Sequence, residues 1–221
     1  MVGDSLEEYY RARAPEYEQI YYRDHPARQA ELAAEAERLA HLAAGKTVLE
    51  LACGTGYWTK VMSATATRIV ASDIAPEAIV EAQKKTYGCE VEFVAADMFT
   101  HAFDDRAFDL VALGFWFSHH PRQEYSRLFD LLTRPLKPRG LIWMTDNNPP
   151  AEGTGEESHE IDEHGNNYKL RSLSNGRTFL ILKNYFSRND LEEILESRFE
   201  IRSLVHNPYY WSAVVTPRGT G

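Results

Sequence analysis

Short apolar segments alternate with helix-forming segments through the middle of the chain. The apolar segments occupy residues 47–51, 68–73, 90–95, 108–113 and 141–146. Strands separated by helices are typical of βαβ units, whose parallel sheet is covered by helices on both faces. We therefore predict an α/β fold with a mostly parallel sheet and right-handed crossovers. A helix is predicted over about residues 122–136, and residues 137–140 form the turn before the last of these strands.

The segments on either side of this core differ from it in amino-acid composition. A helix rich in Ala, Leu and Glu is predicted over residues 27–44, and an acidic loop over residues 147–165. Asn175-Gly176 between two alternating segments predicts a β-hairpin insertion after the fifth strand. We expect one domain, residues 1–221, with an N-terminal helical cover (1–46), a core (47–146), the acidic loop and hairpin (147–186), and a final helix and strand pair (187–217).

Composition argues against several classes of partner. The formal net charge is −9, and no cluster of Lys and Arg along the sequence offsets it, so nucleic acid is a poor candidate. No segment approaches 18 consecutive apolar residues, and the N-terminal residues are charged where a signal peptide is apolar. The two cysteines cannot build a disulfide framework or a zinc site without many other ligands. We predict a cytoplasmic protein, monomeric or homodimeric, that binds no nucleic acid, membrane or metal.

The segment LELACGTGYWT, residues 49–59, joins the first strand to the next helix through a glycine turn. Such a turn presents backbone N–H groups at a helix N-terminus and lets a ligand approach closely. Asp73 ends the following strand, 23 positions after Glu50, where a carboxylate can accept hydrogen bonds from ribose hydroxyls. These features predict a nucleoside-containing cofactor.

Two details favour S-adenosylmethionine over a nicotinamide dinucleotide. The third glycine of the dinucleotide fingerprint would fall near Thr59, where this chain has Trp58-Thr59. Glu50 places a carboxylate just before the turn, which repels a pyrophosphate and favours a cationic or amino-bearing ligand. S-adenosylmethionine carries a sulfonium and an α-amino group and has no phosphate.

The segment V-L-E-L-A-C-G-T-G, residues 48–56, resembles the first motif of class I S-adenosylmethionine-dependent methyltransferases, with Ala52 in place of the first family glycine. Asp73, Asp97-Met98, FDLVALGF and LLTRPLKPRGLIWM follow in the family's order, and the resemblance covers roughly residues 8–146. It implies a Rossmann-like three-layer sandwich with a seven-stranded, mostly parallel sheet and an antiparallel last strand. It also implies a small-molecule methyltransferase whose cofactor is bound by Tyr10, Tyr17, Glu50, Ala52, Gly54, Gly56, Trp58, Asp73, Ile74, Asp97, Met98, Gly114 and Phe115.

Each of these residues has a purely structural alternative. Asp73 and Asp97 could cap helices, Tyr10 and Tyr17 could be packing aromatics, and Trp58 could belong to the core.

The reacting methyl group should face the residues that follow the fourth and fifth strands, because ligands of open α/β sheets bind at the carboxyl ends of the strands. His119, His120 and Asp146 lie there and are the predicted catalytic residues. Histidine can remove a proton from an oxygen or nitrogen acceptor. The alternative is that a histidine caps the helix after Pro121 or hydrogen-bonds internally.

The acceptor is predicted to be a small molecule, and the run Phe115, Trp116 and Phe117 suits either a flat aromatic acceptor or a cationic one. The cations Arg171, Arg177 and Lys183 of the hairpin are expected to be solvated, the alternative being contact with an acidic substrate. Two other functions remain open. One is a nicotinamide-dependent oxidoreductase on the same layout, and the other is a catalytically silent S-adenosylmethionine-binding protein.

Overall fold

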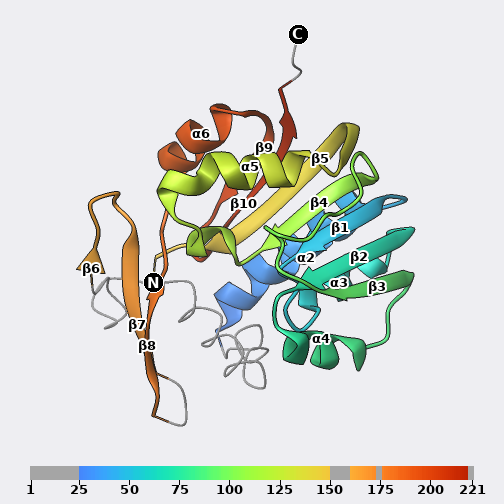
Figure 1. The fold of residues 1–221 in the computed structure, drawn as a ribbon, viewed down its shortest axis with the longest axis horizontal. Coiled ribbons are helices and arrows are strands. Elements are labelled where there is room, and N and C mark those ends of the chain that lie inside the picture. The colour runs from blue at the N-terminus through green and yellow to red at the C-terminus, as the bar shows by residue number, and fades with distance from the viewer. Residues whose placement is uncertain (1–24, 150–159, 173–175, 219–221) are drawn as a thin grey trace.

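A seven-stranded sheet forms the centre of the computed structural model, which describes residues 25–149, 160–172 and 176–218 (Figure 1). The strand order is β3-β2-β1-β4-β5-β10-β9, and all pairs from β3 to β5 are parallel. β10 is antiparallel to both β5 and β9. The strands are β1 (Thr47–Leu51), β2 (Arg68–Asp73), β3 (Glu90–Ala95), β4 (Phe108–Gly114), β5 (Leu136–Asn147), β9 (Phe199–His206) and β10 (Tyr210–Pro217).

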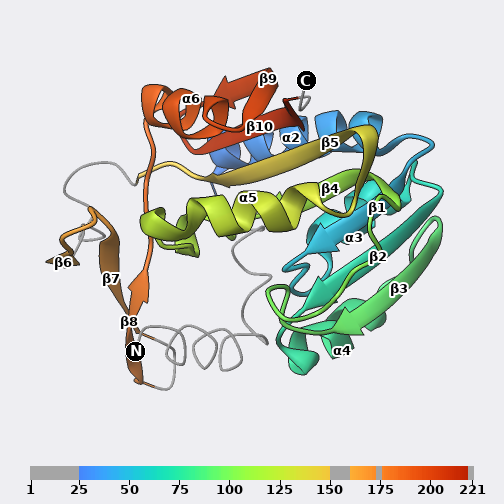
Figure 2. The same cartoon turned by 45° about the horizontal axis from the view of Figure 1, so that its top comes forward.

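Helices cover both faces of this sheet and give it three layers, as predicted (Figure 2). One face carries α5 (Tyr125–Thr133) and α6 (Arg188–Glu196), whose Leu128 and Leu191 are fully buried in the hydrophobic core on that face. The other face carries α2 (Pro26–Ala43), α3 (Tyr57–Ser63) and α4 (Pro76–Gln83), which enclose a second hydrophobic core. Consecutive β1 residues point to opposite faces, so β1 contributes to both cores: Leu49 to the core beneath α5 and α6, and Val48 to the core on the other face.

Local signals set several helix ends. Pro26 occupies the first turn of α2, where its missing N–H is not needed, and the His25 side chain accepts from the Arg28 N–H. At α6, Ser187 and Asp190 form a reciprocal capping box. The helix boundaries therefore follow from residues next to them in the sequence.

A second, three-stranded sheet lies beside the carboxyl end of β5 (Figure 2). It contains β6 (Glu160–Ile161), β7 (Asn167–Ser172) and β8 (Thr178–Leu182), all antiparallel. The predicted hairpin is therefore present and is extended by β6. The Asn184 N–H donates to the Ser118 carbonyl at 2.8 Å, which holds the end of β8 against the loop after β4.

The start of β5 differs from the prediction. Helix α5 ends at Thr133 rather than Leu136, and the expected turn at residues 137–140 belongs to β5 itself. Pro138 cannot continue a helix, and Leu136 already pairs with Phe108 of β4. Arg139 adopts a φ of 65° within this stretch, so the strand starts in an irregular, bulged form.

Candidate active site

Three residues of the glycine turn after β1 have left-handed backbone conformations. Ala52, Gly54 and Gly56 have φ values of 53°, 54° and 83°. A Cβ at Gly56 would lie 2.6 Å from the Tyr87 hydroxyl, so this position requires glycine for space as well as for φ. Ala52, where the family motif has glycine, adopts the glycine-like conformation at a cost in strain.

Asp73 fastens this turn to the end of β2. Its carboxylate accepts from the Gly54 N–H at 2.8 Å and from the Ala75 N–H at 2.9 Å. Burial raises the pKa of Asp73, although these two backbone hydrogen bonds oppose the shift. The carboxylate thus has the capping role given above as the alternative, and each oxygen keeps a further lone pair for a ligand.

Glu50 is buried at the end of β1, directly beneath the turn. Its carboxyl accepts from the Thr59 hydroxyl at 2.5 Å, and its exposed fraction is 2%. Burial raises the pKa of Glu50 to about 8, against the opposing effect of the Thr59 hydrogen bond. Glu50 is therefore held mainly in its protonated form near neutral pH.

Trp58 packs against Gly114, the last residue of β4. A Cβ at Gly114 would lie 2.4 Å from the Trp58 ring, so only glycine allows the ring to pack against this strand end. The ring also contacts Phe115 and Trp143, with centroid separations of 5.7 and 5.0 Å. Trp58 is a core residue here, and its buried indole N–H has no hydrogen-bond partner among the described residues. Phe115, the residue after Gly114, has a left-handed backbone conformation with a φ of 57°.

The remaining predicted cofactor residues follow β2 and β3. Ile74 is exposed, Met98 is buried, and the Asp97 side chain accepts from the Phe99 N–H at 2.9 Å. Asp97 therefore also stabilises its own turn. Tyr10 and Tyr17 lie outside the described residues.

A buried ion pair lies at the carboxyl end of β5. The Lys183 ammonium donates to Asp146 at 2.7 Å and to the Ser118 hydroxyl at 2.6 Å. The Ser118 N–H donates to the other Asp146 oxygen at 2.9 Å. Burial alone would raise the pKa of Asp146, but the charges of Lys183 and His119 and the hydrogen bonds from Lys183 and Ser118 together hold the pKa below its ordinary value. The expectation that Lys183 is solvated is wrong, because β8 turns this side chain inward, where it is 6% exposed.

His119 lies next to this pair, in the 3₁₀ turn η2 (Phe117–His119), and it is 7% exposed. Its Nδ1 lies 2.6 Å from the Leu182 carbonyl oxygen, which can only accept, so Nδ1 carries the proton and Nε2 is the basic nitrogen. Burial and then the Lys183 charge lower the pKa of His119 to about 3, although Asp146 opposes them. The imidazole is therefore neutral at physiological pH.

His120 has a different environment from its neighbour. Its Nε2 donates to the Glu124 carbonyl at 3.1 Å, across the 3₁₀ turn η3 (Arg122–Glu124), and its ring stacks on Phe99 at 5.3 Å. Burial lowers the pKa of His120. The two histidines point apart, and His120 holds the start of α5. Among the described residues no three His, Cys, Asp or Glu side chains are grouped as metal ligands.

The three aromatic side chains that follow β4 also pack in different places. Phe117 is fully buried in the core against Tyr125, and Phe115 packs on the opposite face against Tyr210. Trp116 packs against Phe99. The run thus does not form one aromatic wall.

Arg28 contributes to this end of the sheet, although no motif or spacing in the sequence distinguishes it. It donates to the Tyr210 hydroxyl at 2.7 Å and to the Asn147 side chain at 2.8 Å. Ser118 and Lys183 are likewise absent from the predicted catalytic set. A lysine at the end of the apolar run FLILK was the one available signal for Lys183.

Comparison with known proteins places this geometry in a family. The methyltransferase domain model matches residues 48–140. The solved complex of DhpI with SAH is 30% identical, and the match covers 98% of this chain and 97% of that one, with a TM-score of 0.79. The chain belongs to the class I S-adenosylmethionine-dependent methyltransferases. The DhpI-SAM-HEP complex matches this methyltransferase equally well, at 30% identity and a TM-score of 0.80.

Curated relatives match a shorter region. The demethylmenaquinone methyltransferase of Thermus thermophilus is 34% identical over 114 residues, which are 50% of this chain and 51% of the relative. The cypemycin N-terminal methyltransferase of a Streptomyces species is 33% identical over 110 residues, 49% of this chain and 44% of the relative. The methyltransferase thus spans about half the length of the curated relatives it matches. None of its described helices is long and apolar enough to cross a lipid bilayer.

Proposed function

We propose that this methyltransferase binds S-adenosylmethionine at the glycine turn and methylates an oxygen or nitrogen of a small-molecule acceptor. The observation that carries the proposal is the position of His119. It places a neutral, buried imidazole within the electrostatic reach of the Asp146–Lys183 pair at the carboxyl ends of β4 and β5. The glycine turn lies at the carboxyl end of β1, which pairs directly with β4. Cofactor and acceptor residues therefore share one edge of the sheet.

The residues at the turn fit this cofactor. The left-handed positions Ala52, Gly54 and Gly56 allow close backbone approach, and Asp73 has lone pairs for ribose hydroxyls. Glu50 can exchange its proton for the charge of an α-ammonium group. When bound, S-adenosylmethionine supplies an electrophilic methyl group on a positively charged sulfur. Alignment of the acceptor and exclusion of water are then the main tasks of the protein.

His119 handles the acceptor proton in this scheme. Its Nε2 is the unprotonated nitrogen, and the Nδ1 proton is held on the Leu182 carbonyl, so the ring orientation is set before the acceptor arrives. Asp146 favours the imidazolium that forms when Nε2 takes up the proton, and so acts against burial and the Lys183 charge, which make His119 a weak base in the protein without substrate. Lys183 and Ser118 hold Asp146 in place.

A methyl-transfer screen tests the proposal. The protein is incubated with S-adenosylmethionine and carboxylates, phenols, alcohols and amines, and products are detected by mass spectrometry. We expect a product heavier by one CH₂, which His119→Gln abolishes and the exposed control His41→Gln retains. Tight binding of S-adenosylhomocysteine with no product from any class would instead favour a catalytically silent binding protein. Tight binding of NADH alone would favour the oxidoreductase.

A further inference from the structure

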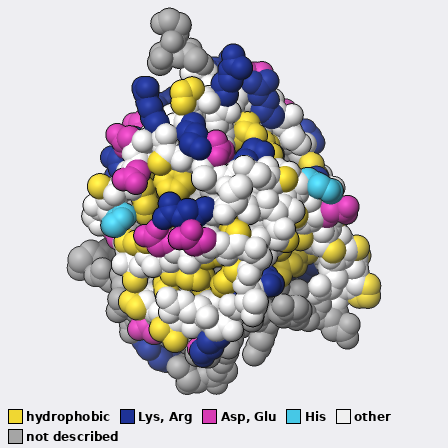
Figure 3. Space-filling model, turned by 90° about the vertical axis from the view of Figure 1, so that its right-hand side faces the viewer, with side chains coloured by type: hydrophobic (Ala, Val, Ile, Leu, Met, Phe, Trp, Pro, Cys, Tyr) yellow, Lys and Arg dark blue, Asp and Glu magenta, His cyan; other side chains and the backbone are white. Residues whose placement is uncertain are grey.

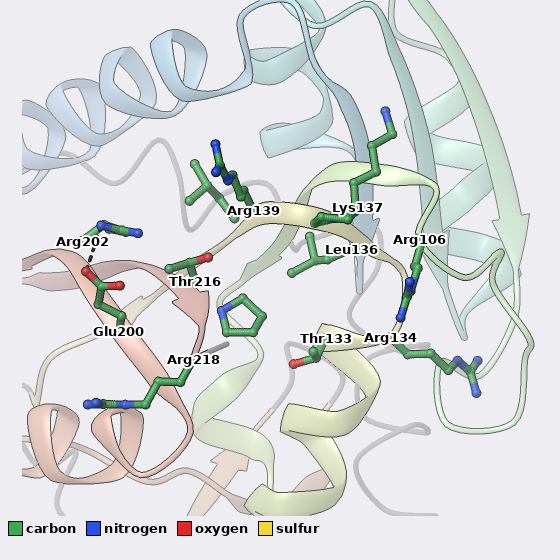
Figure 4. Close-up of a pocket in the computed structure, with 13 residues that line it drawn as sticks. Arg106, Thr133, Arg134, Leu136, Lys137, Arg139, Glu200, Arg202, Thr216 and Arg218 are labelled. Carbon is green, nitrogen blue, oxygen red and sulfur yellow. Dashed lines mark ion pairs between the residues drawn. The ribbon is translucent and has the colours of Figure 1, made fainter. Parts of the chain in front are cut away.

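A groove of about 860 Å³ lies at the opposite edge of the sheet, where β5 begins (Figure 4). Three parts of the chain build it: the loop before β4, the end of α5 with the start of β5, and the ends of β9 and β10. Asp146 lies ten residues along β5 from Leu136, roughly 30 Å away at the rise of a β-strand. The groove is therefore separate from the site described above.

Six cationic side chains line this groove in a protein whose net charge is −9. Seen from the side where β5 begins, Lys and Arg gather in the upper part of the surface (Figure 3). Glu200 is the one acidic residue among the described residues that line the groove. Arg134, Lys137 and Arg139 lie close together in the sequence, and the other three cations join them only in the folded chain: Arg106, Arg202 and Arg218.

Some of these cations are already neutralised and others are not. Arg134, Lys137 and Arg202 pair with Asp105, Asp109 and Glu200 at 3.0, 3.0 and 2.8 Å. Arg106 and Arg139 are exposed and take part in no ion pair within the described part of the chain. Both also have left-handed backbone conformations, with φ values of 53° and 65°. The groove therefore keeps positive charge available for a partner.

The arrangement of the cations indicates the kind of partner. Figure 4 shows Arg106 and Arg134 on one side of Leu136, with Arg202 and Arg218 on the other, so the guanidinium groups surround the groove rather than converge on one point. Four apolar residues lie among them: Leu136, Pro138, Leu141 and Pro217. No aromatic side chain lines the groove among the described residues, so nucleic-acid bases have no stacking platform there.

We propose that this groove docks an acidic, amphipathic segment of a partner protein. Apolar side chains of the segment cover Pro138, Leu141 and Pro217, and its carboxylates pair with the surrounding arginines. An apolar centre with a charged rim is the ordinary composition of a protein–protein interface, and arginine is enriched in such interfaces. A partner bound here leaves the other edge of the sheet open to cofactor and acceptor.

A fluorescent peptide tests the docking surface. The probe is a helix-forming peptide with leucines on one face and glutamates on the other, and its binding to the full chain is followed by anisotropy. We expect saturable binding that weakens as salt is raised. The double variant Arg106→Glu/Arg139→Glu should weaken it by about 10- to 100-fold, since it places two repulsive charges at the rim.

A matched control separates the groove from net charge. Lys60→Glu/Lys84→Glu makes the same change in charge on exposed residues of α3 and the end of α4, and should leave peptide affinity within about twofold. A peptide of the same composition with its leucines scattered should bind more weakly. Absence of saturable binding, equal loss in both double variants, or equal binding of the scattered peptide would overturn the proposal. Tighter binding of single-stranded RNA than of the peptide, lost in Arg106→Glu/Arg139→Glu, would overturn it in favour of nucleic acid.

Discussion

The two halves of the candidate active site are built in different ways. The cofactor half is local: Ala52, Gly54 and Gly56 take up their backbone conformations within a few residues of one another. The acceptor half depends on contacts across long stretches of sequence. Lys183 reaches Asp146 from 37 positions away, and the Leu182 carbonyl reaches His119 from 63 positions away.

This difference determines how each half responds to change. Backbone geometry tolerates side-chain substitution as long as φ is respected, so loss of a side chain that faces the cofactor, such as that of Asp73, should act mainly on cofactor affinity. A buried charge network fails as a unit, because removal of one partner leaves another charge buried and unpaired. Acceptor-side changes should therefore act on folding or on turnover while cofactor affinity is kept.

The largest expected effect follows loss of the Lys183 ammonium. Lys183→Met leaves Asp146 buried without its partner and should lower the free energy of unfolding by about 3–5 kcal/mol, measured by urea denaturation. The matched double variant Asp146→Asn/Lys183→Met removes both charges and should recover most of this loss. Equal stability of the wild type and Lys183→Met would contradict the buried pair.

His119→Gln separates turnover from folding. Gln keeps a donor for the Leu182 carbonyl but cannot accept the proton, so kcat should fall by about 100- to 1,000-fold with little change in cofactor affinity. The pKa of about 3 also predicts that protonation of His119 does not limit kcat/KM between neutral pH and about pH 5. A fall in kcat/KM with an apparent pKa near 6.5 that persists in His120→Gln would show that His119 is not held neutral.

Asp73→Ala tests the cofactor half. Loss of the carboxylate removes the ribose acceptor and frees the Gly54 N–H, so affinity for S-adenosylhomocysteine should fall by about 100-fold. Asp73→Asn keeps one carbonyl acceptor and should lose less. Calorimetry gives both affinities, and normal affinity in Asp73→Ala would refute the ribose assignment.

Glu50→Gln should stabilise the protein without cofactor at neutral pH. The folded pKa of about 8 lies above the ordinary 4.5, so the folded protein binds more protons than the unfolded chain between these values. Stability of the wild type without cofactor should thus decrease as pH rises from about 4.5 to about 8, and Gln should remove that loss, worth at most about 3 kcal/mol at pH 7. Thermal melts across this pH range measure it. An unchanged pH dependence in Glu50→Gln would show that Glu50 is ionised in the folded protein.

Ala52→Gly carries the smallest expected effect. Glycine relieves the left-handed strain at φ 53° but adds freedom to the unfolded chain, so the net gain should be about 0.5 kcal/mol, seen as a small rise in melting temperature. Ala52→Val adds a branched side chain at the same φ and should destabilise instead. A gain in stability with Val would contradict the assigned conformation.

The same contrast explains what could be predicted from sequence. The strands at 47–51, 68–73 and 90–95 match the prediction, since each is a short apolar run ended by a polar residue or a turn. The start of β5 was missed because it depends on pairing with Phe108 rather than on its own turn-like residues.

Side-chain environments were harder to predict than backbone. Both histidines were candidates because they follow β4 in the sequence. Only the folded chain distinguishes them, since His119 is hydrogen-bonded to the Leu182 carbonyl and His120 to the Glu124 carbonyl. Burial of Lys183 depends on how β8 docks against η2, and the sequence places a lysine there without showing which way it points. The basic groove is hidden for a similar reason, because three of its six cations join the others only in the folded chain.

The central claim is that cofactor binding and proton handling reside in separate halves of one site. Titration of S-adenosylhomocysteine into Asp73→Ala and His119→Gln, beside the wild type, tests it most directly. We predict affinity within about threefold of the wild type for His119→Gln and about 100-fold weaker for Asp73→Ala. A comparable loss of affinity in both variants would contradict the division.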